Sequence, residues 1–360
     1  MVQARVGVIG TGRMAETMVA TMVRAPEVRV VGVVSSSGNV DRARSLAAKF
    51  NVSNAYTNTA ALLARDDIDL IYIANKTSTH ADTSIGALQA GKAVLCEKPF
   101  ATTLTDGYRL AEAARQSGCL FMEAIWTPFL PAYRRVFELA RARAIGVPAH
   151  LSASFGCPVS PSANPRLFDI NGGGVLLDRA VYLVTLALKL FGPIETMEAS
   201  LIRTANGVDS LASLQLGHAS GGQSQLAASL TTLLSNTAVI AGPEGSITLE
   251  PPLVGTQQIT IRRMKPMGDT PSEASPRTKL QKHLQELRSL SAIRRLRRYL
   301  SDGSREQHPY GFSQYGPQLQ HVLGLLRSKK RESDIVPVEF SLEVLRVIDA
   351  VRSGGTKIKL

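Results

Sequence analysis

Residues 10–15 read G-T-G-R-M-A, and this glycine turn constrains the fold more than any other feature of the chain. It follows an apolar run at 6–9 and precedes a stretch of helical periodicity at 15–24. In this setting the glycines allow a tight turn and the close approach of a dinucleotide pyrophosphate, and the start of the helix offers free N–H groups to it. A plain strand–helix turn is the alternative. The residues expected to contact the dinucleotide are Gly10, Thr11, Gly12, Arg13 and Met14.

The first 125 residues alternate short apolar runs with helical patterns, which is typical of a parallel α/β sheet. The expected strands are 6–9, Val28–Val34, 70–74, Ala93–Cys96 and 120–123, with a short one in 51–55. The expected helices are 15–24, 43–50, 84–90 and Leu104–Ser117.

From residue 126 onward the pattern changes to longer alternating strands, which are typical of a mostly antiparallel sheet. The expected strands are 150–155, 196–203, 210–216, 223–232, 237–241, 246–249 and 258–262, covered on one face by helices at 175–190, 316–327 and 341–352. The predicted fold class is therefore α/β plus α+β, with residues 1–125 as the first domain and residues 126–360 as the second.

The second expected strand ends in Ser35, Ser36 and Ser37, and the first acidic residue after it is Asp41. An acid at the strand end would bind the ribose 2′-hydroxyl of NAD, whereas hydroxyls with a nearby arginine suit the 2′-phosphate of NADP. Arg42 or Arg44 can supply that arginine. We therefore expect NADP, held in part by Ser35, Ser36 and Arg42, with NAD as the second choice. A polar turn without a ligand is the alternative.

Ionisable side chains follow one strand and one helix in a pattern that suits proton transfer. Lys98 stands at the end of the strand Ala93–Cys96, where ligands of open parallel sheets bind. Asp178 and Tyr182 are spaced i, i+4 after three glycines, so we expect them on one helix face. A solvated lysine and a structural Asp–Tyr hydrogen bond would give the same sequence.

Most of the net charge of +12 lies in one short segment. Residues 277–298 contain eight Lys/Arg and one acid, a local charge of +7, within an insertion at about 264–305. Leucines and isoleucines spaced three or four apart predict an amphipathic helix there. A surface helix with a solvated basic face is the simplest interpretation, and binding to nucleic acid or an anionic membrane is the alternative.

The cysteine pattern and the hydropathy exclude several other classes of protein. Three cysteines without a C-x-x-C pair argue against a disulfide framework and a cysteine zinc site, so no metal is expected. The start of the chain does not resemble a signal peptide, and no window is apolar enough to span a bilayer. A soluble cytoplasmic protein is the prediction.

Together these pieces resemble the Gfo/Idh/MocA oxidoreductase family. The resemblance covers nearly the whole chain except about 264–305, and the run 122–126 (M-E-A-I-W) is most similar to the branch of dimeric dihydrodiol dehydrogenases and NADP-dependent D-xylose dehydrogenases. The matching stretches are 8–15, 71–80, 90–99, 121–131, 145–155, 166–182, 208–209, 241–247 and 332–352.

The resemblance implies an N-terminal Rossmann domain and a C-terminal domain whose open sheet often forms a dimer interface, so a homodimer or higher homo-oligomer is expected. It also implies NADP(H)-dependent hydride transfer at a hydroxyl or carbonyl carbon of a sugar, polyol or cyclic diol. Catalytic roles fall on Lys98, Tyr182 and Asp178. Further cofactor contacts fall on Ala74, Asn75, His80, Glu97 and Lys98, and substrate contacts on Trp126, Arg166, Asp178 and Tyr182.

The chemistry of tyrosine agrees with these roles but needs help, because its usual pKa is about 10. The cation of Lys98 would favour the tyrosinate, which could then take the proton of a substrate hydroxyl. Trp126 could form a wall of the substrate pocket or simply belong to the core. Arg166 could reach the substrate or a cofactor phosphate, or pair with Asp169.

The chain departs from the family pattern at three places. The usual D-x-G-x-Y is D-R-A-V-Y here, so the bulky Arg179 and Ala180 could change how the helix approaches the cofactor. Asn75-Lys76 replaces the more common Thr-Pro, and Pro128 stands where the branch often has arginine. A dinucleotide-binding regulator or scaffold without turnover is therefore kept as the alternative function, and the substrate and the physiological direction are left open.

Overall fold

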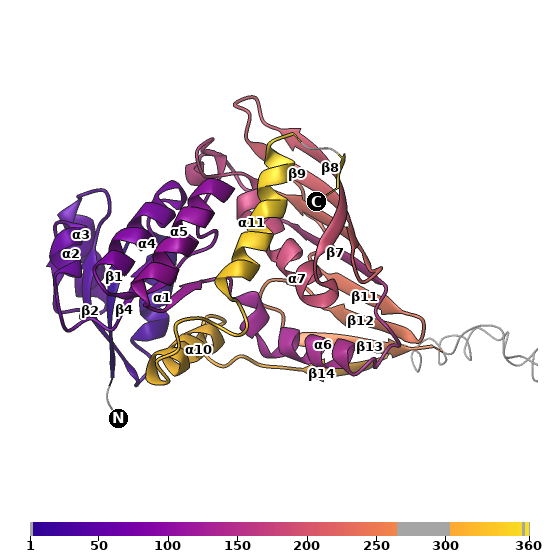
Figure 1. Cartoon of the computed structure of the whole chain (residues 1–360), viewed down its shortest axis with the longest axis horizontal. Helices are drawn as coiled ribbons and strands as arrows, with labels where there is room; N and C mark the ends of the chain where they lie inside the picture. Colours follow the sequence, from indigo (N-terminus) through magenta and orange to yellow (C-terminus); the bar gives the residue numbers. More distant parts are fainter. Residues whose placement is uncertain (1–2, 265–302, 355–356, 360) are drawn as a thin grey trace, which may run out of the picture.

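The computed structural model describes residues 3–264, 303–354 and 357–359. It contains a six-stranded parallel sheet and a nine-stranded, mostly antiparallel sheet (Figure 1). This confirms the predicted fold class. The predicted basic helix at 277–298 lies outside the described residues.

The first sheet has the strand order β3-β2-β1-β4-β5-β6, with all neighbours parallel. Its inner strands are continuous runs of buried apolar residues, as expected for a sheet covered on both faces by helices. The strands are β1 (Ala4–Ile9), β2 (Val28–Val34), β3 (Ala55–Tyr56), β4 (Leu70–Ile73), β5 (Ala93–Cys96) and β6 (Phe121–Glu123). The helices are α1 (Arg13–Met22), α2 (Val40–Lys49), α3 (Thr59–Leu63), α4 (His80–Gln89) and α5 (Leu104–Ser117), with the short 3₁₀ turn η1 (Thr77–Thr79) before α4.

Several predicted boundaries in this half were wrong: the helix expected at 84–90 is α4, which begins at His80, and the helix expected at 15–24 is α1, which begins at Arg13. Two further differences have clear local reasons. The helix expected at 43–50 begins at Val40, because the side chain of Asn39 accepts a hydrogen bond from the Arg42 N–H and caps an earlier turn. The short strand expected in 51–55 is instead β3 at Ala55–Tyr56, because only these two residues pair with the end of β2.

The second sheet has the order β14-β13-β12-β11-β7-β10-β9-β8-β15, and its one parallel pair is β7 with β10. Its strands are β7 (His150–Gly156), β8 (Ile194–Arg203), β9 (Asp209–His218), β10 (Gln223–Ser229), β11 (Ala238–Gly242), β12 (Gly245–Leu249), β13 (Gln258–Arg263), β14 (Ser304–Gln307) and β15 (Lys357–Lys359). The helices and turns after residue 126 are η2 (Thr127–Phe129), α6 (Pro131–Arg141), η3 (Pro165–Phe168), η4 (Leu176–Ala180), α7 (Val181–Phe191), α10 (Gly316–Arg327) and α11 (Val338–Arg352).

Helices α6 and α7 pack on the second sheet, and α11 lies between α5 and α7, so it joins the two sheets (Figure 1). Helix α6 was not predicted. Leu342 and Leu345 of α11 belong to the apolar cluster on one face of the first sheet. The last helix therefore packs against the first domain as well as the second, and the predicted boundary at 125/126 stays a prediction.

Candidate functional site

A cavity of about 280 Å³ lies between the carboxyl ends of β4 and β5 and the start of α7. Residues from both halves of the chain line it, as expected for a ligand site at the edge of a parallel sheet. The predicted site residues found in its wall are Arg13, Met14, Ala74, Asn75, His80, Glu97, Lys98, Trp126, Arg166, Asp178 and Tyr182. The other predicted residues, Gly10, Thr11, Gly12, Ser35, Ser36 and Arg42, lie outside this cavity, on the β1–α1 and β2–α2 connections.

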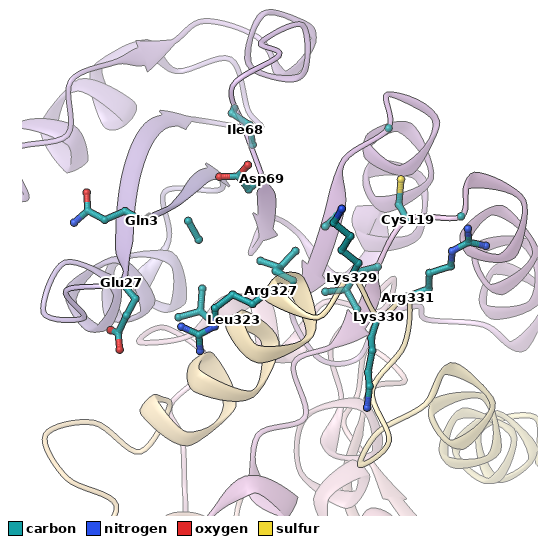
Figure 2. A pocket seen from close by; sticks show the side chains of 16 residues that line it. Gln3, Glu27, Ile68, Asp69, Cys119, Leu323, Arg327, Lys329, Lys330 and Arg331 are labelled. Carbon is teal, nitrogen blue, oxygen red and sulfur yellow. The ribbon is translucent and has the colours of Figure 1, made fainter. Parts of the chain in front are cut away.

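A larger cavity of about 630 Å³ lies at the opposite edge of the first sheet, where its strands begin (Figure 2). Arg327, Lys329, Lys330 and Arg331 line it from the end of α10 and the turn after it, together with Glu27 and Asp69. None of the predicted site residues reaches it. We therefore place the functional site at the smaller cavity.

The glycine turn has the geometry that a bound pyrophosphate needs. Gly10 has φ +130°, and a Cβ there would lie 2.3 Å from the Ala74 carbonyl oxygen, so only glycine fits. A Cβ at Gly12 would meet no atom within 4 Å, which means that open space faces the turn. Gly12 is also the N-cap of α1 and caps it without a side chain, so the first N–H groups of the helix stay available. These features fit a dinucleotide phosphate.

The end of β2 offers hydroxyls and no acid. The Ser35 hydroxyl is buried and lies 3.0 Å from the Ser37 hydroxyl and 3.4 Å from that of Thr11. Of the two predicted arginines, Arg44 forms an ion pair with Asp41 at 3.2 Å. Arg42, in the first turn of α2, forms no ion pair or side-chain hydrogen bond within the described ranges. The arrangement fits an anionic group beside Ser35 and Arg42.

Lys98 and Asp178 form the central ion pair of the cavity. The Lys98 ammonium donates to Asp178 Oδ1 at 2.9 Å and to the Asp178 carbonyl oxygen at 2.8 Å. Burial would raise the pKa of the Asp178 carboxyl, but the Lys98 charge and hydrogen bond outweigh it and hold that pKa below its usual value. Asp178 is therefore a carboxylate at neutral pH, bonded to an ammonium on the opposite wall.

The segment that contains Asp178 is a turn of π-helix, η4, which α7 continues from Val181. The wider π turn changes the angular spacing that the i, i+4 argument assumes. Asp178 binds Lys98, whereas the Tyr182 hydroxyl accepts a hydrogen bond from Trp126 Nε1 at 3.0 Å. The two side chains line one cavity but have separate partners, so the predicted direct Asp–Tyr relay is not the arrangement observed.

We expected the Lys98 cation to favour the tyrosinate form of Tyr182, but other groups outweigh it in this structure. Burial, followed by the nearby carboxylates of Glu97 and Asp178, raises the pKa of the Tyr182 hydroxyl well above its usual value. The Lys98 ammonium lies 4.9 Å from the centre of the Tyr182 ring, over its face, and donates its hydrogen bonds to Asp178. Tyr182 is therefore a neutral phenol at neutral pH.

His80 and Asn75 line the cavity beside the glycine turn. The His80 ring is buried, which lowers its pKa to about 4, and its Nδ1–H donates to the Pro99 carbonyl oxygen at 2.8 Å. Asn75 Nδ2 donates to Thr83 Oγ1 at 2.8 Å. His80 Nε2 and Asn75 Oδ1 are buried without a hydrogen-bond partner among the described residues.

Glu97 lines the cavity, and its role as a cofactor contact stays a prediction. Its carboxyl accepts a hydrogen bond from the Tyr72 hydroxyl at 2.7 Å, beneath the sheet edge. Burial raises the pKa of this carboxyl. One carboxylate oxygen of Glu97 is therefore bound to the buried Tyr72 hydroxyl, although the residue borders the cavity.

The sequence left the roles of Arg166 and Arg179 open. The structure shows no pairing of the Arg166 side chain with Asp169, and Arg166 lines the cavity. The Asp169 side chain accepts hydrogen bonds from the Asn171 backbone and amide, and the exposed guanidinium of Arg166 has no hydrogen bond or ion pair within the described part of the chain. Arg179 does not enter the cavity. Its buried guanidinium donates to the carbonyl oxygens of Cys157 and Ser229, at the ends of β7 and β10. The bulky Arg179 therefore packs against the second sheet and does not obstruct the cavity.

The sequence did not identify several other residues in the cavity wall. Phe155, at the end of β7, places its ring 6.1 Å from that of Tyr182, and Tyr315 places its ring 5.0 Å from that of Trp126. Phe155 stood at the end of an expected strand, which is a weak signal. Gln314 and Tyr315 precede α10 without any local pattern, so only the tertiary structure could find them.

The sequence and structure comparisons define the class of protein. Residues 4–125 match the Gfo/Idh/MocA family, described as an oxidoreductase family with an NAD-binding Rossmann fold, and residues 133–248 match the C-terminal domain of the same family. The chain belongs to this family and is an NAD(P)-dependent oxidoreductase. Both the predicted family and the predicted enzyme class are confirmed.

The individual relatives agree with the predicted branch. A trans-1,2-dihydrobenzene-1,2-diol dehydrogenase of Xenopus laevis is 29% identical over 273 residues, which cover 75% of this chain and 82% of the relative. The protein of the same name in Mus musculus is 31% identical and covers 67% of this chain and 73% of its own length.

Solved structures show the same fold. A 3-ketoreductase from Actinomadura kijaniata in complex with NADP and TDP-benzene has a TM-score of 0.78 and 25% identity, with 98% of each chain covered. An aldose-aldose oxidoreductase from Caulobacter crescentus, complexed with glycerol, has a TM-score of 0.80 and 19% identity, with 99% of this chain and 100% of that chain covered.

Proposed function

We propose that the protein transfers a hydride between NADP(H) and a hydroxyl or carbonyl carbon of a sugar, polyol or cyclic diol. One observation supports this most: the Lys98–Asp178 pair and Tyr182 face the same cavity that adjoins the glycine turn. A protein that only binds a dinucleotide does not need an acid–base group at that cavity. The family assignment also favours the enzyme over a regulator or scaffold.

The preference for NADP rests on the end of β2. Ser35, Ser36 and Arg42 would hold the 2′-phosphate, and no acid stands there to bind the 2′-hydroxyl of NAD. The 3-ketoreductase from Actinomadura kijaniata was solved with NADP. The N-terminus of α1, with Gly12, would hold the pyrophosphate, and Asn75 and His80 would face the nicotinamide end. NAD remains the second choice.

The proposed substrate class follows from the wall of the cavity. The rings of Trp126, Phe155 and Tyr315 would cover an apolar ring face, while Lys98, Asp178 and Tyr182 would bind hydroxyl or carbonyl oxygens. A sugar, polyol or cyclic diol has both kinds of surface. The diol dehydrogenases and the sugar oxidoreductase among the relatives agree with this class.

In the proposed reaction, the nicotinamide supplies or accepts the hydride when it is bound. Tyr182 gives a proton to the carbonyl oxygen in reduction, or takes the hydroxyl proton in oxidation. Lys98 keeps one N–H beyond the two hydrogen bonds to Asp178, and this N–H would bind the same substrate oxygen. Asp178 holds the Lys98 ammonium in place.

Turnover and cofactor binding test this proposal separately. NADP⁺ and NAD⁺ would be offered with aldoses, polyols and trans-dihydrodiols to the native protein and to the Lys98→Met and Tyr182→Phe variants. We expect both variants to lose turnover by a factor of about 10² or more and to keep cofactor affinity. Turnover that survives in both variants would refute the assigned roles.

The same assay tests the choice of cofactor. We expect Arg42→Ala to weaken NADPH binding by a factor of about 10 to 100 and to leave NADH binding unchanged, because a charge-assisted hydrogen bond contributes about 1.5–3 kcal/mol. Arg44→Ala is the matched control, since Arg44 is bound to Asp41. Equal effects of the two variants would exclude Arg42 as the phosphate ligand.

A homodimer and a cytoplasmic location stay predictions. The open face of the second sheet exposes Ser213 and Gln215 of β9 and Gln225 of β10, and it is the face that a second copy would cover. Within the described residues, no helix is long and apolar enough to cross a bilayer.

A further inference from the structure

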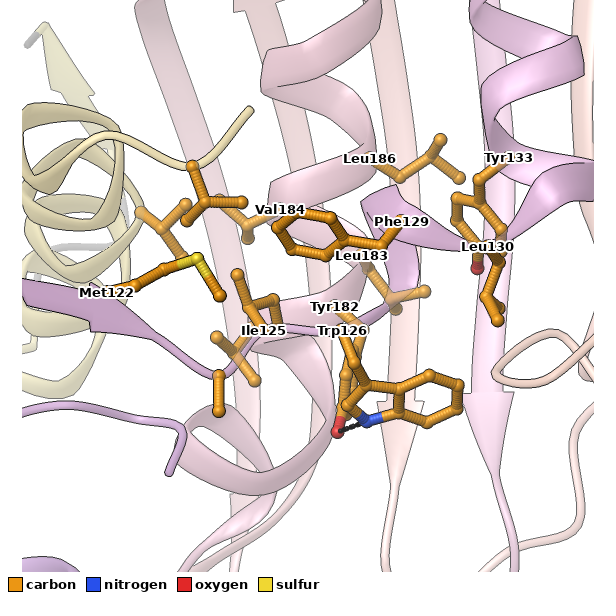
Figure 3. Packing of buried hydrophobic residues seen from close by; sticks show 14 of the residues in the cluster. Met122, Ile125, Trp126, Phe129, Leu130, Tyr133, Tyr182, Leu183, Val184 and Leu186 are labelled. Atoms are coloured by element: carbon orange, nitrogen blue, oxygen red, sulfur yellow. Dashed lines mark hydrogen bonds between the residues drawn. The ribbon is translucent and has the colours of Figure 1, made fainter. Parts of the chain in front are cut away.

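Trp126 is the only tryptophan of the chain, and its indole N–H donates to the Tyr182 hydroxyl at 3.0 Å (Figure 3). It follows β6, whereas Tyr182 lies in the first turn of α7, so the bond joins segments that are 56 positions apart. The Trp126 and Tyr182 residues are only 5% and 7% exposed. The bond is therefore made inside the protein, away from competing water.

This hydrogen bond has only one possible polarity. An indole N–H is a donor and never an acceptor, so Tyr182 must accept through a lone pair of its oxygen. The indole is also held in place by two edge-on ring contacts. The centre of its ring lies 6.0 Å from that of Tyr182 and 5.0 Å from that of Tyr315. The donor direction is thus fixed before any ligand enters.

The hydrogen of the Tyr182 hydroxyl is then left for the ligand. The Trp126 bond is the one hydrogen bond of this hydroxyl within the described residues, and Tyr182 lines the cavity. With one lone pair bound to the indole, the O–H has no acceptor among the described residues and is available to a ligand in the cavity. An oxygen of a bound carbonyl compound is the acceptor it lacks.

We propose that Trp126 is a positioning residue that fixes Tyr182 as the proton donor of the reaction, with its hydrogen aimed at the substrate oxygen. This rests on the proposed function. In reduction, a C–H bond forms at the carbonyl carbon with the hydride, the π pair of the carbonyl moves to its oxygen, and that oxygen takes the Tyr182 proton. The resulting tyrosinate keeps the Trp126 hydrogen bond and recovers a proton from water. Oxidation runs in reverse and needs the tyrosinate first, so it should accelerate as the pH rises.

The first experiment uses no cofactor and no substrate. Because the chain has a single tryptophan, a ¹⁵N-labelled sample of the full-length protein gives one indole N–H resonance. We expect this resonance to be protected from solvent exchange, and to shift and lose protection in the Tyr182→Phe variant. An indole resonance unaffected by Tyr182→Phe would overturn the proposal.

The second experiment measures how oxidation depends on pH. A hydrogen bond to the charged tyrosinate is lost in Trp126→Phe, so we expect the midpoint of the kcat–pH profile to move up by about 1 to 2 pH units. Below the midpoint, kcat should fall by a factor of about 10 to 100. Replacement of Trp126 by benzothienylalanine, in which sulfur replaces the N–H in a ring of the same shape, should give the same shift and guards against a folding defect.

Phe129→Leu is the matched control for packing. Phe129 belongs to the same apolar cluster as Trp126 but contacts His321 and does not line the cavity. It should lower the melting temperature without moving the midpoint. A midpoint that stays in place in both Trp126 variants would overturn the proposal. If no compound is oxidised at all, the proposed function fails, whereas an indole resonance unaffected by Tyr182→Phe refutes the Trp126–Tyr182 hydrogen bond itself.

Discussion

Removing the Lys98 ammonium should leave Asp178 with only its weaker ion pair to Arg179, whose Nε lies 3.8 Å from Asp178 Oδ2, and Lys98→Met is the variant that does this with little loss of volume. The side chains of Lys98 and Asp178 are 13% and 25% exposed, so their ion pair is closer to a buried one than to a surface one. Removing one partner of a buried pair costs about 3–5 kcal/mol, whereas exposed pairs contribute about 0–1 kcal/mol. We therefore expect the variant to lose about 2–4 kcal/mol of unfolding free energy at pH 7.

The pH dependence gives this prediction a sign. In the native protein the pKa of Asp178 is held below its usual value, so its stabilising contribution is present above about pH 4 and is lost as the pH falls through the folded-state pKa. Without Lys98, only the charges of Arg179 and Arg166 oppose burial, so we expect that pKa to rise above its unfolded value. In the variant, the free-energy cost of burying the charged Asp178 is then present at pH 7 and disappears as the pH falls through the raised pKa. The difference between the two proteins should shrink from pH 7 toward pH 4.

Urea unfolding followed by circular dichroism at pH 7 and near pH 4.5 measures this difference. Adding Asp178→Asn to Lys98→Met should recover more than half of the loss at pH 7, because the buried charge is gone. The control is Lys76→Met, at an exposed lysine before η1, which should change stability by less than about 0.5 kcal/mol. A loss below about 1 kcal/mol at pH 7, or an equal loss at both pH values, would refute the reasoning.

Two further predictions concern the glycine turn and a second buried acid. Gly12→Ala should fold normally, since its methyl would meet no atom within 4 Å, yet it should bind NADP(H) at least about tenfold more weakly. Gly10→Ala should instead lower the unfolding free energy, because its Cβ would lie 2.3 Å from the Ala74 oxygen. Equal cofactor affinity in Gly12→Ala and the native protein would contradict the assigned phosphate site. Burial raises the pKa of Glu123 from 4.5 to about 7, so the folded state binds this proton more tightly than the unfolded one. Stability should therefore fall by about 3 kcal/mol between pH 4.5 and pH 7, and Glu123→Gln should flatten that slope in urea melts; a native protein that gains stability over this window would exclude the effect.

The strands of the first sheet could be predicted because each inner strand is buried on both faces and therefore forms one apolar run. Helices were harder to predict where their limits depend on caps rather than on apolar periodicity, as Asn39 shows for α2. Helix α6 was missed although Pro131, at its first position, is a recognised start signal. Strand β14 has mostly exposed side chains, so it lacks the hydrophobic pattern on which the prediction depended.

The site shows a sharper limit of sequence reasoning. Motifs located the glycine turn, Lys98, Asp178 and Tyr182, because each stands beside a recognisable strand end or glycine run. The partner of each side chain could not be predicted, since partners come from other segments. Lys98 meets Asp178 across 80 positions, and Trp126 meets Tyr182 across 56. Only the packing of α7 against the first domain decides these pairs.

The residues in these two pairs have different effects on the charge of the Tyr182 oxygen. Glu97 and Asp178 both lie near Tyr182, and their charges disfavour a negative charge on its oxygen. Lys98 cannot fully offset them, because two of its hydrogen bonds go to Asp178 and its charge lies over the ring rather than at the hydroxyl. The Trp126 N–H is the protein donor that touches the oxygen itself. A resting phenol with one stabilising donor is the protonation state from which Tyr182 would give its proton to a carbonyl oxygen in the proposed reduction.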